Sequence, residues 1–162
     1  MSQFAASWRL SRQRLLDALT GLNTEQLAWQ LHADALPLGQ AALHVAGVEV
    51  SFSSQLLDLE LDDFGAKLKA AATDSVVNDK PFPFADSEIT PELVSAAFAY
   101  SLKMVEPLME HPTDAVLRKE IVSALGPVIT GEGALARLGF HAAYHQGQAY
   151  LISMAPAFPG RP

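Results

Sequence analysis

Two histidines, His141 and His145, are four positions apart in a stretch, residues 138–160, that contains no charged residue. On an α-helix this spacing corresponds to about 40° around the axis and about 6 Å along it, so both imidazoles project from one face. Apolar residues continue the same face at spacings of three and four, which predicts that the face is buried. The pair can therefore converge on one metal ion.

A third histidine, His44, lies on the inward face of another expected helix, and a helical bundle can bring it opposite the pair. Three neutral imidazoles without a thiolate suit Zn²⁺, Ni²⁺ or Fe²⁺, with at least one position left for water. Buried without partners, three imidazoles would each cost about 1–3 kcal/mol, and one ion removes that cost for all of them. The simpler alternatives are a hydrogen-bonded core histidine at 44 and a hydrogen-bonded or coincidental pair at 141 and 145.

Other catalytic motifs are missing from the sequence. The zinc-protease motif needs a glutamate directly after its first histidine, and Ala142 occupies that position here. Glu49, five residues after His44, is expected to point elsewhere. No serine triad order, phosphate-binding glycine loop or carboxylate pair stands out. A metal-bound water would therefore lack an obvious protein base.

Several further polar residues have a functional and a simpler interpretation. Gln148, one turn beyond His145, can orient a ligand or water at the site, but a core or interhelical hydrogen bond is the simpler interpretation. Ser11 and Arg12 interrupt the apolar stripe of the first helix and can line the open side of the site. The simpler interpretation makes Ser11 a helix–helix contact and Arg12 a solvated side chain. His32 and His111 are predicted to be surface residues.

The apolar periodicity predicts an all-α domain built on four long helices, packed as an antiparallel bundle. A short helix capped by Asn23 or Thr24 follows the first long one, and Thr90 and Thr130 are expected to cap the third and fourth long helices. Residues 61–89 are the least regular part, where "AKLKAAA" can continue or restart a helix, and residues 116–128 form an extended excursion. Pro107 is expected to kink or shorten the third long helix. The long helices are expected at about 3–20, 38–60, 90–110 and 130–153.

The composition describes one globular domain, residues 1–162, with a C-terminal tail from about residue 154. A net charge of −7 disfavours nucleic acid and anionic membrane surfaces as partners. Residues 138–160 are long enough to span a bilayer, but transferring their histidines and glutamines into hydrocarbon costs free energy, so the sequence does not predict a membrane span. The absence of cysteine fits a reducing cytoplasm and excludes a cysteine nucleophile.

Three segments carry a resemblance to a known family. "LPLGQAALHVAGVEVSF", "TPELVSAAF" and "ITGEGALARLGFHAAYHQGQAYLI" resemble the DinB-like superfamily, which includes the bacterial YfiT-type thiol transferases. The most specific part is the histidine of the second long helix together with the His-x-x-x-His of the last, followed by Gly147 and Gln148. Two positions depart from the usual pattern: Gln146 stands where relatives often have arginine, and Leu43 where they often have tryptophan.

The resemblance implies a four-helix bundle of up-down-down-up connectivity, a divalent metal on the residues matching His44, His141 and His145, and a homodimer. It also implies metal-dependent S-transfer, in which a low-molecular-weight thiol is joined to an electrophilic small molecule; hydrolysis is a related possibility. The alternative is a non-catalytic, stress- or DNA-damage-induced bundle whose metal is structural or vestigial. A third hypothesis comes from the residues and not from the resemblance: Phe52, Phe82, Phe84 and Phe98 would suit a carrier for an apolar ligand, although core and loop-anchor roles explain them more simply. Fold alone does not choose between them.

Overall fold

The computed structural model describes residues 2–160 and is mostly helical, as the sequence predicts. No helix in this described part is both long enough and apolar enough to cross a bilayer. Two short antiparallel strands, β1 (Glu120–Val122) and β2 (Val128–Thr130), form a ribbon, and η1 (Asp86–Glu88) is a single 3-10 turn. The α-helices are α1 (Ala5–Leu19), α2 (Thr24–Ala28), α3 (Leu38–Leu57), α4 (Asp63–Ala71), α5 (Pro91–Glu110), α6 (Asp114–Arg118) and α7 (Gly131–Ser153).

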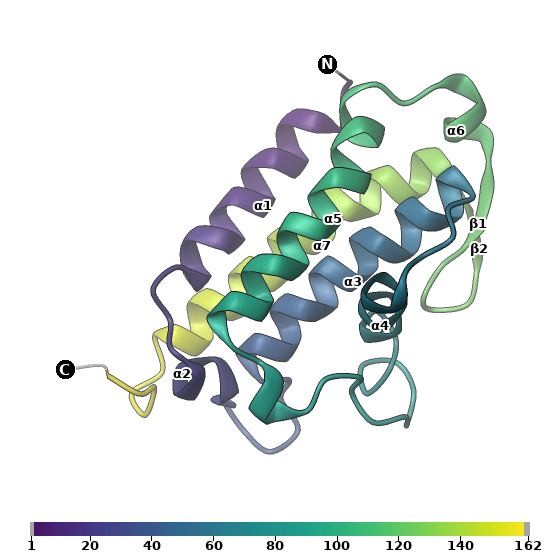
Figure 1. Ribbon diagram of the computed structural model, residues 1–162. Helices are drawn as coiled ribbons and strands as arrows, with labels where there is room; N and C mark the ends of the chain where they lie inside the picture. Colours follow the sequence, from purple (N-terminus) through teal and green to yellow (C-terminus); the bar gives the residue numbers. More distant parts are fainter. Residues whose placement is uncertain (1, 161–162) are drawn as a thin grey trace.

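The four long helices, α1, α3, α5 and α7, lie side by side (Figure 1). α1 packs on α7, while α3 contacts α5, α7 and the shorter α4. In α3, 17 of 20 residues are buried, which is typical of a helix that is covered on all sides. The β1–β2 ribbon contacts α3 and α7 near the end of the bundle where α3 ends and α7 begins (Figure 1).

Short polar side chains begin most of the helices. The caps of α2, α4, α5, α6 and α7 each accept a hydrogen bond from the backbone N–H three residues later, which satisfies a donor that the helix leaves free. Those of α2, α5 and α7 lie where the sequence predicted them. The capping residues are Asn23, Asp62, Thr90, Thr113 and Thr130.

The structure refines or departs from the sequence expectation in four places. The irregular region 61–89 contains α4, and the excursion at 116–128 begins with the last residues of α6 before the ribbon. α5 is not shortened at Pro107 but continues to Glu110. Leu59, which falls within the helix expected at about 38–60, is 47% exposed because α3 ends at Leu57 and Asp58 adopts a left-handed conformation.

Beyond Ser153 the chain leaves α7 and continues in turns, at the position expected for the tail. Phe158 is buried there and packs edge-on against Trp29, with 5.6 Å between ring centroids. This contact ties residues 154–160 to the segment after α2. Residues 161–162 of the expected tail lie outside the described residues.

A buried ion pair joins α1, α3 and α5, and it corrects the interpretation of Arg12 as solvated. Arg12 is 6% and Glu49 is 1% exposed. Nε of Arg12 donates to the Glu49 carboxylate at 3.1 Å, and Nη2 donates to the carbonyl of Phe98 at 2.6 Å. The carboxylate also accepts from Trp8 Nε1 at 3.0 Å and from Ser101 Oγ at 2.5 Å. The position at which the apolar pattern of α1 is interrupted is thus a core position, and the charged side chain of Arg12 occupies it.

Such a pair holds its helices in one arrangement because leaving either charge without its partner is costly. Each carboxylate oxygen of Glu49 accepts two or more hydrogen bonds, so the charge is well compensated. Ser11, in contrast, is half-buried, and its hydroxyl donates to the carbonyl of Ser7 one turn earlier. Neither Ser11 nor Arg12 lies at the histidine cluster.

Replacing Arg12 by methionine should lower the free energy of unfolding by about 3–5 kcal/mol, because the Glu49 carboxylate stays buried without a cation. The double variant Arg12→Met with Glu49→Leu should recover most of that loss. Urea unfolding measures both. Arg14→Met, an exposed position on the same helix, is the matched control and should change stability by no more than about 0.5 kcal/mol. Additive losses in the double variant would contradict the pairing.

Candidate metal centre

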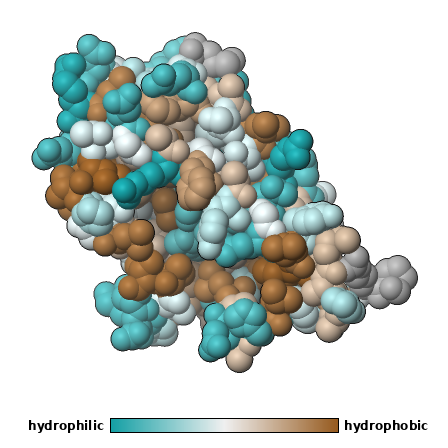
Figure 2. All heavy atoms as spheres, turned by 180° about the vertical axis from the view of Figure 1, so that it is seen from behind, coloured by the Kyte–Doolittle hydropathy of each residue, from teal (hydrophilic) through white to brown (hydrophobic). Residues whose placement is uncertain are grey.

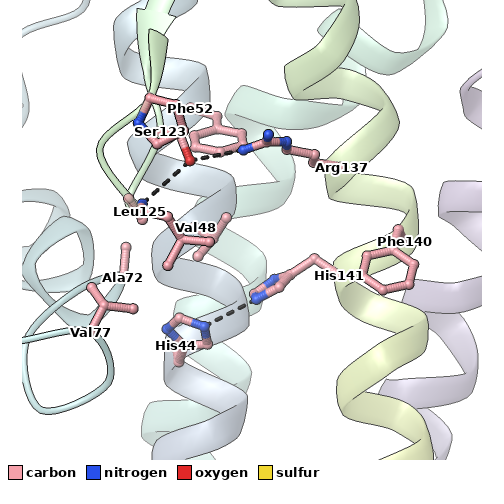
Figure 3. A pocket seen from close by; sticks show the side chains of 12 residues that line it. His44, Val48, Phe52, Ala72, Val77, Ser123, Leu125, Arg137, Phe140 and His141 are labelled. Atoms are coloured by element: carbon pink, nitrogen blue, oxygen red, sulfur yellow. Dashed lines mark hydrogen bonds between the residues drawn. The ribbon is translucent and has the colours of Figure 1, made fainter. Parts of the chain in front are cut away.

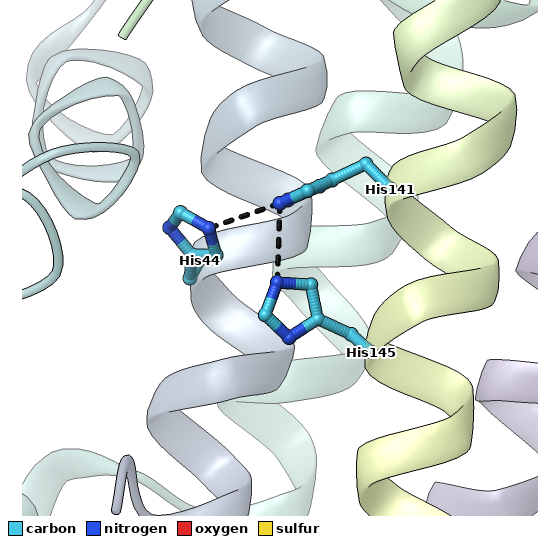
Figure 4. A group of neighbouring side chains, drawn as sticks. All are labelled: His44, His141 and His145. Atoms are coloured by element: carbon cyan, nitrogen blue, oxygen red, sulfur yellow. Dashed lines mark hydrogen bonds between the residues drawn. The ribbon is translucent and has the colours of Figure 1, made fainter. Parts of the chain in front are cut away.

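Three histidines from two helices meet between α3 and α7 (Figure 4). Nε2 of His141 lies 3.0 Å from Nε2 of His44 and 3.1 Å from Nε2 of His145. One ligand nitrogen from each ring falls within 4.8 Å of the others. The sequence predicted these three residues, and the structure brings all of them together. His32 and His111 are exposed, as expected.

His44 is held by a backbone carbonyl at the end of α4. Its Nδ1 lies 3.1 Å from the carbonyl oxygen of Ala71 and must donate to it, which leaves the lone pair on Nε2 facing the other two rings. Gly47, one turn further along α3, makes this contact possible. A Cβ at that position would collide with the Leu68 carbonyl and approach the amide of Ala72, so glycine lets α4 lie close against α3.

Hydrogen bonds among the three rings cannot account for both close contacts between their Nε2 atoms. Because His44 presents a lone pair, the contact between His44 and His141 needs a proton on Nε2 of His141. That proton cannot also serve the contact with His145, so one of the two close contacts stays unsatisfied. A cation accepts all three lone pairs at once. Two nitrogens bound to one ion at about 2.1 Å lie about 3.0–3.4 Å apart for angles between about 90° and 109°. The 3.0 and 3.1 Å contacts of His141 fall in this range, whereas the bound of 4.8 Å on all three separations leaves His44 and His145 room to lie further apart.

Burial keeps the three rings neutral, which is the form that binds a metal. It lowers the pKa of His141 to about 2, helped by the neighbouring rings of His145 and His44. Burial and the nearby His44 lower the pKa of His145 to about 4. Burial also lowers the pKa of His44, although its bond to Ala71 acts in the opposite direction. All three rings therefore offer lone pairs at neutral pH.

The ring nitrogen of His145 that faces away from the cluster, Nδ1, has weaker hydrogen bonding than the corresponding nitrogen of His44. Nδ1 of His145 is buried and has no hydrogen-bond partner of ordinary geometry among the described residues. The half-buried Gln148 raises the pKa of His145 through its side chain, which places the amide near the ring. Its role in orienting His145 remains a prediction. Tyr144 packs edge-on against the same ring, with centroids 5.1 Å apart.

A cavity of about 380 Å³ opens beside His44 and His141 (Figure 3). α3, α7, the segment that follows α4 and the turn of the β1–β2 ribbon contribute its walls. Arg137, one turn before His141, spans from α7 to the ribbon, where Nη1 donates to Ser123 Oγ at 2.9 Å. The other lining residues are Val48, Phe52, Ala72, Val77, Ala124, Leu125, Pro127 and Phe140.

The sequence reasoning missed Arg137 and Ser123. For Arg137 a signal was present, because positions 137, 141 and 145 follow one another at intervals of four and so share a face of one helix. For Ser123 there was none, since its place depends on how the ribbon folds over α3. Among the described residues, the only cluster with three or more possible metal ligands is the histidine triad.

Comparison with known proteins gives no assignment: no family model, no curated protein and no solved structure matches the chain.

The metal-free protein should lose stability as the pH falls from 7 to 5. The folded-state pKa values of His141 and His145, about 2 and about 4, lie below the unfolded value of 6.5. The unfolded chain therefore takes up more protons below pH 6.5, and each histidine should cost up to about 1.4 kcal/mol per pH unit. Urea unfolding after chelator treatment measures the slope. His145→Gln should reduce the slope, whereas His111→Gln, at an exposed position, should not; equal slopes in all three proteins would contradict the burial of these rings.

Proposed function

We propose that the chain is a metal-dependent protein of the DinB-like type, in which His44, His141 and His145 hold one divalent ion, Zn²⁺, Ni²⁺ or Fe²⁺. The observation that carries the proposal is the convergence of three neutral imidazole nitrogens beside an accessible cavity. We further propose that the site joins a low-molecular-weight thiol, through its sulfur, to an electrophilic small molecule, in the cytoplasm.

The chemistry of the surrounding residues supports transfer from an external thiol. When bound, a divalent ion lowers the pKa of a water or thiol toward neutrality, so no strong protein base is required. Ala142 supplies no base, and Glu49 is committed to Arg12. The chain has no cysteine, so the thiol must come from a small molecule. The sulfur–carbon bond then forms as the leaving group departs with its electron pair, and the thiol proton passes to solvent.

The arrangement of the long helices supports the family assignment. The proposed topology is an up-down-down-up four-helix bundle of the DinB/YfiT type formed by α1, α3, α5 and α7. Its support is their side-by-side packing and the origin of the ligands, one histidine from α3 and two from α7. Gln146 and Leu43 remain departures from the pattern. Leu43 is fully buried and Gln146 half-buried, so neither leaves an unfilled position.

The alternative function is a non-catalytic module, active in a stress or DNA-damage response, with a structural metal. A structural site of this kind is closed by a fourth protein ligand, whereas a catalytic site keeps one position free. Among the described residues the cluster contains three ligands, and His44 and His141 line the cavity. This openness favours transfer, or the related hydrolysis, over the structural alternative.

A homodimer is also part of the proposal. α7 exposes Phe140, Tyr144, Tyr150 and Leu151, and residues 138–160 include no charged side chain. Figure 2 shows the face opposite to that of Figure 1, where several apolar side chains lie at the surface. Exposed apolar patches of this kind are typical of protein interfaces.

Purified wild-type protein should contain about one divalent metal ion per chain, and His145→Ala should contain less than a tenth of that amount. Removal of one of three ligands weakens the grip on the ion and opens the buried site to water. Plasma emission spectrometry measures the metal, and circular dichroism confirms that the variant is folded. His32→Ala, at an exposed histidine, is the matched control. Equal metal in wild type and His145→Ala would remove the site.

The same proteins distinguish transfer from the structural alternative. Wild type loaded with metal should accelerate conjugation of a thiol such as bacillithiol or glutathione with an electrophile such as 1-chloro-2,4-dinitrobenzene. His145→Ala should fall to the uncatalysed rate while His32→Ala keeps full activity. Metal binding without any conjugation or hydrolysis, across a panel of thiols and electrophiles, would favour the structural alternative.

Leu151→Glu should shift the protein from dimer toward monomer, because a carboxylate at an apolar contact must be desolvated without a partner. Sedimentation velocity at several concentrations measures the change. Val122→Glu, a similarly exposed apolar residue on the ribbon, is the matched control and should leave the dimer intact. A wild-type protein that stays monomeric throughout the concentration range would contradict the homodimer.

A further inference from the structure

The cavity beside the histidine triad combines apolar walls with one cation. Val48 and Phe52 line it from α3, Leu125 from the ribbon and Phe140 from α7. Phe140 and Leu125 are 69% and 73% exposed, so the cavity meets solvent along these two side chains. Walls of this kind bind the apolar part of a small molecule, and the few polar groups set its orientation.

Arg137 is the polar group with unused bonding capacity in this cavity. Its guanidinium has five N–H donors, and its only hydrogen bond among the described residues is the one to Ser123 Oγ. None of the 12 lining residues is acidic, and Arg137 has no ion-pair partner in the described chain. In a protein with 18 acidic and 11 basic residues, this leaves an uncompensated positive charge at an apolar wall.

Ser123 fixes the position of that charge. The serine is 5% exposed, and its hydroxyl accepts from Arg137 Nη1 at 2.9 Å and from the amide of Leu125 at 3.4 Å. The ribbon therefore holds the guanidinium at the cavity, and its remaining donors suit the two oxygens of a carboxylate.

The spacing along α7 sets the length of the ligand. Arg137 precedes His141 by four residues, about 6 Å along the helix, and both line the cavity. A molecule whose carboxylate meets Arg137 can extend its apolar part about one helical turn, past Val48, to the triad. A polar molecule of the same length would leave its own hydrogen-bonding groups unpaired against Phe52 and Val48.

We infer that this cavity binds an apolar carboxylic acid, with the carboxylate on Arg137 and the apolar body directed along α3 toward His44 and His141. The inference rests on the proposed function in one respect: within it, this acid is the electrophilic substrate rather than the thiol. Binding of the acid itself depends on Arg137 and the walls, and so it is measurable with or without metal.

The test compares 4-phenylbutyrate with its neutral isostere 4-phenylbutanamide by isothermal titration calorimetry, on the full chain in zinc-loaded and chelator-treated forms. The acid should bind at least about ten-fold more tightly than the amide in both forms, the ratio expected when one charge-assisted hydrogen bond to the exposed Arg137 is lost. Arg137→Gln should abolish that preference. Arg14→Gln, which removes the same charge from an exposed position on α1, should preserve it.

A second variant tests the walls. Val77, 40% exposed at the cavity, can be changed to tryptophan without altering the buried core. Val77→Trp should weaken the acid and the amide together by filling the space, with the far-ultraviolet circular dichroism unchanged. Reduced glutathione, a polar carboxylate, should compete weakly with 4-phenylbutyrate.

Three outcomes would overturn the inference. The first is a preference for the acid that disappears on zinc removal and survives Arg137→Gln, which places the carboxylate on the metal. The second is tighter binding of glutathione than of 4-phenylbutyrate in the competition experiment, which would assign Arg137 to the thiol substrate. The third is the absence of 4-phenylbutyrate binding at millimolar concentration. If wild type takes up no metal while the acid preference persists in the chelator-treated form, the proposed function fails and the carboxylate site stands.

Discussion

The structure depends on three imidazole nitrogens meeting at a point where hydrogen atoms cannot satisfy all of them. Nε2 of His141 is about 3 Å from two other ring nitrogens, and the His44 tautomer is set by the Ala71 carbonyl. Burial keeps the three rings neutral, so each has one N–H and one lone pair. The N–H groups that face the cluster are too few to make a hydrogen bond at both close contacts. A divalent ion could accept all three lone pairs, and its binding would also stabilise the fold, since the unfolded chain does not bring the rings together.

Much of the surrounding architecture serves to place His44. α3 is the most enclosed helix, and Gly47 allows α4 to approach it until the Ala71 carbonyl reaches the ring. Glu49, five residues further, is rotated by about 140° around the same helix and faces the opposite side. There it binds Arg12, Trp8 and Ser101. The two polar clusters of the core are thus separated by α3: one is an ion pair with its hydrogen bonds, and the other is a histidine triad that could hold a metal ion.

The cavity links this chemistry to the surface. The β1–β2 ribbon contributes Ser123 and Leu125, α7 contributes Arg137, and the segment after α4 contributes Val77, so elements far apart in the sequence form one binding space. An apolar interior with one held guanidinium selects by charge at the rim and by shape inside. Access to the triad through such a space is what separates a reactive ion from a structural one.

The sequence by itself determined the four long helices, the short helix after the first of them and the ligand candidates. The period of the apolar residues and the caps Asn23, Thr90 and Thr130 are local signals, since a helix start needs only its own side chains and backbone. The interval from 141 to 145 likewise fixed a shared face. Only the tertiary structure decided which polar residues are buried together. The charge at Arg12 resembled a solvated position because its partner Glu49 is 37 residues away. Arg137 and Ser123 became neighbours only through the fold of the ribbon, because contacts between distant segments depend on packing geometry that local patterns do not encode.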